Sequence, residues 1–142
     1  MDASALADAL LHPRGSDAVL DLLADDAAEI VVPHLCDVEV LSVFQNAVRR
    51  GHVEVDHALR ALEQFLELPL QRFEHPALLR RAFALRENFS AYDALYVALA
   101  EGLAAPLVTA DARLARAVRM WTDLEVVEVA RSDPGAETGS TR

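Results

Sequence analysis

A single acid inside an apolar run constrains this chain more than any other feature. From Ser90 to Ala100 the sequence SAYDALYVALA has the length and apolar content of a buried helix, and Asp93 is its only charge. A buried carboxylate without a partner costs several kcal/mol, which favours a chemical role. Ser90-x-x-Asp93 also fits a capping box, in which the acid satisfies backbone donors of the first turn. Asp93 alone leaves both interpretations open.

A second acid follows a predicted strand. We expect the helix of Asp93 to end at Gly102 and Pro106 to Thr109 to form a short buried strand, with Asp111 directly beyond its end. Ligands of α/β proteins bind at this open end of a parallel sheet. Asp111 also suits the N-cap of a helix over 112–119, so its role too stays open.

A third acid lies on an apolar helix face. Glu39 is the only charge from Val38 to Val48, and it shares its face with Leu35 and Val43, four residues to either side. An unpaired acid there would shift its pKa or bind a cation. The alternatives are an Arg partner or a position at the rim of the core.

The remaining pattern predicts an α/β protein with a short, mainly parallel sheet flanked by helices, because helices alternate with short apolar strands. Strands are predicted over 29–33, 70–73, 106–109 and 126–129. Helices are predicted near 6–11, 16–23, 35–50, 56–66, 76–88, 90–102 and 112–119.

Composition excludes several classes of function. The length of 142 residues and 53% hydrophobic content indicate one globular domain, and a net charge of −10 argues against broad adhesion to nucleic acid or anionic membranes. All 13 basic residues are Arg, so lysine-based Schiff-base, phosphate-loop and kinase chemistry is excluded. The single Cys36 rules out an internal disulfide and suits a reducing compartment. With no apolar run of about 20 residues, we expect a cytoplasmic protein without membrane association.

Four acidic motifs together resemble those of the PIN-domain ribonucleases. They are Asp2-Ala3-Ser4, Glu39 in DVEVLS, Asp93 in SAYDALYVALAE and Asp111 in LVTADARLA. The short length is similar to that of VapC toxins of bacterial VapBC toxin-antitoxin systems. The resemblance implies a PIN domain over residues 1–130 with a three-layer sandwich, and the Ser, Pro, Gly and Thr content of 131–142 predicts a disordered tail.

The resemblance implies a chemistry for these residues. Asp2, Glu39, Asp93 and Asp111 would bind Mg²⁺ or Mn²⁺ as catalytic residues, with Ser4 and Thr109 supporting the site through their hydroxyls. Hard divalent cations prefer such oxygen ligands. The implied reaction is endonucleolytic cleavage of RNA, of which tRNA or rRNA is the expected target, leaving a 5′-phosphate and a 3′-hydroxyl. A VapB-like antitoxin and a homodimer are the implied protein partners.

Two further expectations concern the arginines and the N-terminus. From their spacing, Arg113 and Arg116 are predicted to touch RNA phosphate. In the family a short apolar strand precedes the first acid, whereas only Met1 precedes Asp2 here. We therefore expect Asp2 to lie on a fraying terminus and the natural start to lie a few residues upstream.

The carboxylates alone permit other functions. An inactive or truncated PIN domain would act only by binding an antitoxin, and a metal-dependent phosphoesterase or DNA nuclease would use the same acids on another substrate. A purely structural helical module would require every embedded acid to be a cap or an ion-pair partner.

Overall fold

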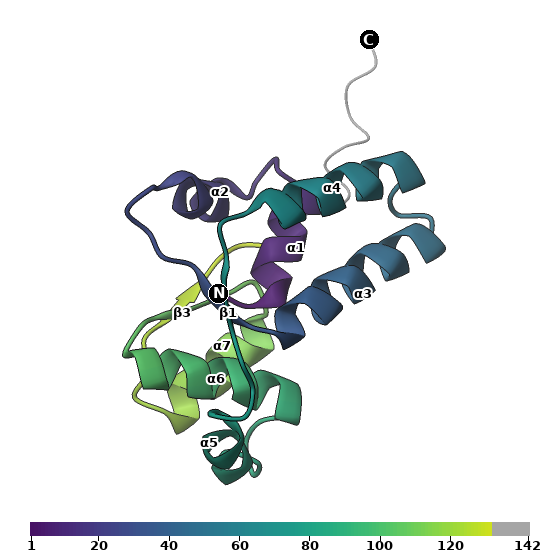
Figure 1. Cartoon of the computed structure of the whole chain (residues 1–142). Helices are drawn as coiled ribbons and strands as arrows, with labels where there is room; N and C mark the ends of the chain where they lie inside the picture. Colours follow the sequence, from purple (N-terminus) through teal and green to yellow (C-terminus); the bar gives the residue numbers. More distant parts are fainter. Residues whose placement is uncertain (132–142) are drawn as a thin grey trace.

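The computed structural model describes residues 1–131 (Figure 1). The helices span Ala3–Leu11 (α1), Asp17–Ala24 (α2), Leu35–Arg49 (α3), Val55–Glu67 (α4), Leu79–Ala84 (α5), Ala91–Leu103 (α6) and Ala112–Trp121 (α7). The strands span Val31–Pro33 (β1), Gln71–Phe73 (β2), Leu107–Thr109 (β3) and Val126–Glu128 (β4). This alternation confirms the predicted α/β class. Of the predicted tail only Arg131 is described, and 132–142 lie outside the described residues.

The strands form two parallel pairs. In register, β1 lies beside β2 and β3 beside β4, with Val31 opposite Gln71 and Leu107 opposite Val126. All pairing among residues 1–131 is therefore parallel, as predicted, but it forms two two-stranded sheets instead of one. The carboxyl end of β3, at Thr109, leads directly into Asp111.

The first two residues lie between these pairs. The Asp2 amide donates to the Val108 carbonyl at 2.8 Å, and the Met1 amine lies 3.5 Å from the Val31 carbonyl oxygen. Met1 is 9% exposed and Asp2 is 5% exposed, and burial lowers the pKa of the Met1 amine. The expectation of a frayed Asp2 is therefore wrong, because main-chain bonds and packing hold it.

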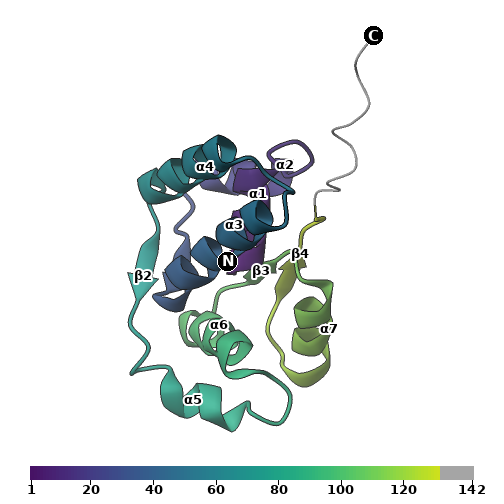
Figure 2. The same ribbon diagram turned by 90° about the vertical axis from the view of Figure 1, so that its right-hand side faces the viewer.

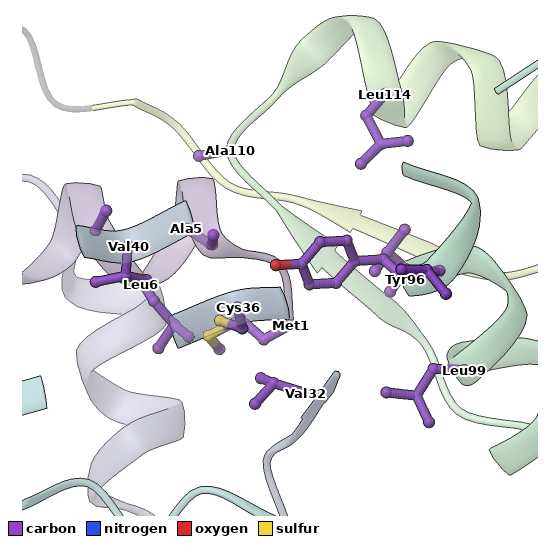
Figure 3. Packing of buried hydrophobic residues seen from close by; sticks show 14 of the residues in the cluster. Met1, Ala5, Leu6, Val32, Cys36, Val40, Tyr96, Leu99, Ala110 and Leu114 are labelled. Carbon is purple, nitrogen blue, oxygen red and sulfur yellow. The ribbon is translucent and has the colours of Figure 1, made fainter. Parts of the chain in front are cut away.

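Helices cover both faces of the strands in three layers. Figure 2 shows α1 to α4 on one side and α5 to α7 on the other. Helix α1 contacts β3 and α3 contacts β1, while α6 contacts both strands from the opposite face. Leu6, Val32, Cys36, Val40 and Tyr96 meet in the core between these layers (Figure 3). Burial of such side chains stabilises the fold by about 1.5–3 kcal/mol each.

Two predicted helix boundaries differ from the structure. Helix α6 does not end at Gly102: it continues to Leu103 and closes at Ala104 in the left-handed conformation, with φ 48°. Ala104 therefore does what a glycine usually does at this position. The helix predicted over 76–88 is reduced to α5, because turns occupy both of its flanks. Within residues 1–131, no helix is long and apolar enough to cross a membrane.

Candidate active site

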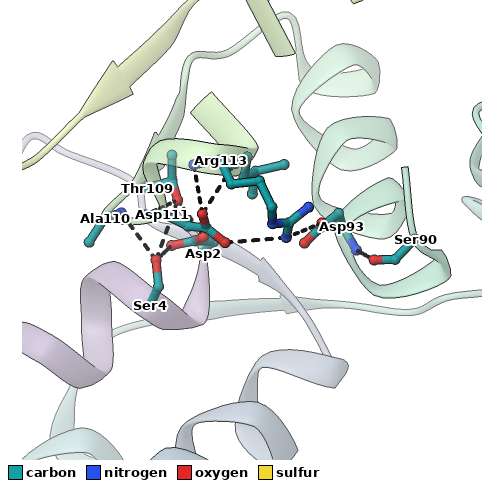
Figure 4. Close-up of polar contacts among 9 residues, drawn as sticks. Asp2, Ser4, Ser90, Asp93, Thr109, Ala110, Asp111 and Arg113 are labelled. Carbon is teal, nitrogen blue, oxygen red and sulfur yellow. Dashed lines mark hydrogen bonds and ion pairs between the residues drawn. The ribbon is translucent and has the colours of Figure 1, made fainter. Parts of the chain in front are cut away.

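Asp2 is a buried carboxylate held by three donors. As the N-cap of α1 it accepts from the Ala5 amide at 3.1 Å, and the Ser4 hydroxyl donates to the same oxygen, Oδ1, at 2.8 Å. The Thr109 hydroxyl donates to Oδ2 at 2.5 Å (Figure 4). Burial raises the pKa of Asp2, and these donors only partly oppose that rise. A cation beside Oδ2 would therefore stabilise the ionised carboxylate.

Asp111 performs two tasks with its two carboxylate oxygens. Its Oδ1 caps α7 by accepting from the amides of Arg113 at 2.9 Å and Leu114 at 3.2 Å, so the predicted cap is confirmed. Its Oδ2 points away from the cap, 3.3 Å from the Arg113 guanidinium. The Asp111 amide also donates to the Thr109 hydroxyl at 3.0 Å, which couples this acid to Asp2. Capping therefore leaves one oxygen of Asp111 for another partner.

Asp93 enters the site from the first turn of α6. Ser90 caps this helix by accepting from the Asp93 amide at 3.1 Å, which forms one half of the predicted capping box. The Asp93 carboxylate instead pairs with Arg113, with 2.9 Å between Oδ2 and Nη2 (Figure 4). The Asp93 side chain is 16% exposed. Asp93 therefore combines a helical start with a carboxylate that faces the other acids.

Glu39 approaches from α3. Its Oε1 is buried and makes no hydrogen bond to any described residue. Glu39 also forms no ion pair within residues 1–131, so the alternative of an Arg partner is wrong for this part of the chain. Burial raises the pKa of Glu39, and the charges of Asp2 and Asp93 raise it further. The nearby Tyr96 hydroxyl lowers this pKa and so partly opposes the rise. That hydroxyl is buried and makes no hydrogen bond to a described residue. Asp2 and Asp93 therefore lie close enough to Glu39 for their charges to raise its pKa.

One cleft of about 520 Å³ collects all four acids. Helix α1 contributes Ser4 to its walls, and α3 contributes Glu39. The other lining residues are Asp2, Ala3, Asp8, Leu11, His12, Ser42, Val43, Asn46, Ala47, Arg50, His52, Asp93, Tyr96, Asp111 and Arg131. The cleft is therefore acidic where α1, α6 and β3 meet, and it carries cations further along α3.

The arginines that line this cleft differ from the two that the sequence predicts to touch RNA phosphate, and that contact stays a prediction. Arg50 and Arg131 line it, whereas Arg113 lies at the Asp93–Asp111 pair and Arg116 is exposed one turn further along α7. Arg116 makes no ion pair with another residue of the described chain. Arg50 lies eleven residues after Glu39, on the same helical face, and that spacing could have revealed it. Arg131 offered no such signal, because it follows the last strand.

The donor set fits a hard divalent cation. Carboxylate oxygens are the ligands that Mg²⁺ and Mn²⁺ prefer, and Glu39 Oε1 and Asp111 Oδ2 are not committed to backbone donors. In this conformation no three His, Cys, Asp or Glu side chains of residues 1–131 are close enough together to hold one ion. A cation held by three or more of these carboxylates would therefore require their side chains to move closer together.

Comparison with known proteins identifies the family of this site. The family model described as PIN domain matches residues 1–120, which include all four acids. The chain belongs to the PIN-domain family. Among PIN proteins, ribonuclease VapC1 of Mycobacterium tuberculosis is 38% identical over 128 residues, covering 89% of this chain and 96% of the relative. Ribonuclease VapC12 of the same organism is 35% identical over 127 residues, covering 89% and 97%.

A solved structure has a fold similar to that of this chain. The crystal structure of PAE2754 from Pyrobaculum aerophilum superposes with a TM-score of 0.64 and 26% sequence identity, covering 88% of this chain and 79% of that one. The layered arrangement of helices around short parallel strands is therefore shared with a solved structure. The predicted resemblance to PIN-domain proteins and VapC ribonucleases is confirmed.

Proposed function

We propose that this PIN domain is a metal-dependent endoribonuclease, the toxin of a VapBC-type toxin-antitoxin pair. The observation that carries the proposal is the convergence of Asp2, Glu39, Asp93 and Asp111 on one cleft from four separate segments. Relatives that cover most of this chain are named ribonucleases. Helix caps or rim residues alone would not require four separate segments to place their carboxylates in one cleft.

The four carboxylates would hold Mg²⁺ or Mn²⁺ directly or through water. Asp2 is fixed by Ser4 and Thr109, so it supplies the rigid part of the site. Glu39 supplies an oxygen that has no other partner among the described residues. When bound, the ion supplies the Lewis acid that activates water and neutralises phosphate charge.

The reaction would be hydrolysis of an RNA phosphodiester bond. Water oxygen adds to phosphorus, the bond from phosphorus to the 3′ oxygen breaks, and that oxygen takes up a proton. The products are a 5′-phosphate and a 3′-hydroxyl. In this scheme the acids orient the water and accept its proton, while Ser4 and Thr109 keep Asp2 in place.

RNA phosphates would meet arginines outside the acids. Arg50 and Arg131 line the same cleft, and the α7 residues Arg113 and Arg116 lie beside it or one turn away. Arginine binds phosphate bidentately, so a few such contacts orient a strand even on a protein with a net charge of −10. Selectivity for tRNA or rRNA would then rest on the shape of the RNA more than on nonspecific attraction.

Exposed apolar surfaces support the protein partners of the proposal. On α3 and α4, Val38, Leu59 and Leu66 are more than half exposed, which suits a helical segment of a VapB-like antitoxin. On the opposite side, Leu79 and Phe83 of α5 are exposed beside an apolar groove that α6 completes, and this surface suits a homodimer contact.

The decisive experiment is a cleavage assay of the full chain with Mn²⁺ or Mg²⁺. Cellular RNA and single-stranded DNA of matched length are incubated separately with wild type, Asp93→Asn and the exposed control Asp123→Asn, each with and without EDTA. We expect wild type and Asp123→Asn to cut RNA only when metal is present. The cleavage rate of Asp93→Asn should be at least about 100-fold lower, as when one group that stabilises charge in a transition state is removed. End mapping should find 5′-phosphates.

Other outcomes select the competing functions. Cutting of DNA with RNA spared would indicate a DNA nuclease, and hydrolysis of small phosphoesters alone would indicate a phosphoesterase. A folded wild type that cuts neither polymer would point to a PIN domain that acts only by binding an antitoxin.

A further inference from the structure

The Arg113 guanidinium places a positive charge between two of the four acids, Asp93 and Asp111. Its Nη2 is 2.9 Å from Asp93 Oδ2 and 3.3 Å from Asp111 Oδ2 (Figure 4). Arg113 is the second residue of α7, so its backbone is fixed by the same Asp111 side chain that its guanidinium contacts. The guanidinium therefore joins α6 to the start of α7 across the site.

A metal ion would need an oxygen that Arg113 now contacts. Asp111 Oδ1 is committed to two backbone donors of α7, so Oδ2 is the oxygen of Asp111 that remains for a cation. The oxygen of Asp93 that meets Arg113 is likewise its Oδ2. A guanidinium and a divalent cation cannot both occupy the space between these two atoms.

The Arg113 pair is weak enough to be exchanged. The Arg113 side chain is 70% exposed, against 16% for Asp93, and ion pairs made by an exposed side chain contribute little to stability. Without this guanidinium or a metal ion, two neighbouring carboxylates would repel each other. An exposed arginine thus prevents that repulsion at little cost to later cation binding.

We propose that Arg113 is an exchangeable internal counter-ion, which neutralises Asp93 and Asp111 until a divalent cation displaces it from their Oδ2 atoms. The proposal rests on the metal site of the proposed function. Once displaced, the guanidinium stays attached to the first turn of α7 beside the acids. It then becomes a donor for the phosphate of the substrate strand, which a guanidinium binds bidentately.

Manganese binding tests the exchange without any measurement of activity. Mn²⁺ is titrated into wild type, Arg113→Gln and Arg116→Gln, with binding followed by calorimetry and by the paramagnetic resonance signal of free Mn²⁺. Arg116→Gln removes the same charge one turn along α7, from a side chain without an ion pair among the described residues. We expect Arg113→Gln to bind Mn²⁺ about two- to fivefold more tightly than Arg116→Gln, the factor that removal of a competing exposed pair allows.

A second variant and a second readout support the titration. Arg113→Lys keeps the charge but lacks the planar fork, so its Mn²⁺ affinity should lie between those of wild type and Arg113→Gln. The Mn²⁺-induced rise in melting temperature should follow the same order, because a ligand of the folded state stabilises according to its affinity.

The possible results separate the two proposals. Equal Mn²⁺ affinity in Arg113→Gln and Arg116→Gln, or weaker affinity in Arg113→Gln, would overturn the exchange; the weaker value would mean that Arg113 positions the acids for metal. Absence of Mn²⁺ binding in wild type and in every variant would overturn the metal site itself.

Discussion

The Thr109 hydroxyl donates to Asp2 Oδ2 at 2.5 Å and joins residues 107 positions apart in the chain. Thr109 is fully buried at the end of β3, and Asp2 is the N-cap of α1. This bond therefore connects the first acid to the strand that leads to the last acid. The rigidity of the proposed metal site depends on it.

Thr109→Val should weaken both folding and metal binding. A buried hydrogen bond to a charged group contributes about 1.5–3 kcal/mol, so the free energy of unfolding should fall by that amount. Because Thr109 lowers the pKa of Asp2, its loss should also favour the protonated acid and reduce Mn²⁺ affinity. Urea unfolding and Mn²⁺ titration measure the two effects. Thr122→Val, which loses a hydroxyl bond to the Val118 carbonyl, is the matched control. Equal Mn²⁺ affinities in the two variants would contradict this role of Thr109.

Glu39→Gln should change how stability depends on pH. Burial, with Asp2 and Asp93, raises the pKa of Glu39 above its ordinary value of 4.5 in the folded protein. Above pH 4.5 the folded state therefore binds more protons at this site than the unfolded state, and stability falls as pH rises through the raised pKa. The Gln side chain of Glu39→Gln does not ionise, so this variant does not lose stability in this way as pH rises.

Urea unfolding in EDTA at a series of pH values tests this sign. The stability of Glu39→Gln relative to wild type should increase from pH 4.5 towards neutrality. Asp2 and the Met1 amine are present in both proteins, and the charge of Asp2 is part of what raises the pKa of Glu39. Exposed Glu63→Gln on α4 serves as the control. If the difference in free energy of unfolding between Glu39→Gln and wild type stayed constant across this pH range, folding would not disfavour the ionised form of Glu39.

Arg50→Gln should weaken RNA binding. Arg50 follows Glu39 by eleven residues, about 16 Å along α3 at 1.5 Å per residue, so it would contact a phosphate other than the one at the acids. Measured in the Asp93→Asn background to keep the RNA intact, its loss should reduce affinity and lower the slope of log K against log salt by about 0.7. Arg60→Gln on α4 should change neither quantity. An unchanged slope in Arg50→Gln would place the RNA elsewhere.

His75→Ala should loosen the start of α3. The Leu35 amide donates to His75 Nε2 at 2.9 Å, which satisfies one of the free donors of the first turn of α3. Loss of this acceptor should cost about 1 kcal/mol and speed hydrogen exchange at the amides around Leu35. His34→Ala removes the neighbouring exposed ring but leaves the acceptor in place. Similar exchange rates in the two variants would contradict a capping role for His75.

The sequence predicts the order of elements because each element carries a local signal. Alternating apolar runs and turn residues locate the strands within one or two residues, and Asp111 marks the start of α7 correctly. The end of α6 lacked such a signal: Gly102 is the usual terminator, yet the chain turns at Ala104. Alanine in the left-handed conformation is held by its surroundings, and those surroundings are not visible in local sequence.

The contacts inside the candidate site are harder to predict. Spacing places Glu39 on an apolar face, but it does not show that Oε1 lacks a hydrogen-bond partner among the described residues. Spacing also indicates that Arg113 and Arg116 lie on neighbouring turns of one helix, but not that only Arg113 reaches Asp93, twenty residues earlier. Such pairings depend on how α6 and α7 pack against β3, which is a property of the folded chain.

Diffraction from crystals soaked in Mn²⁺ tests the central claim most directly. An anomalous peak should lie in the cleft within coordination distance of carboxylate oxygens from Asp2, Glu39, Asp93 and Asp111, directly or through ordered water, with Arg113 moved away from Asp93 Oδ2. A fully soaked crystal with no peak in the cleft, or with Mn²⁺ bound only at surface acids elsewhere, would contradict a four-carboxylate metal site.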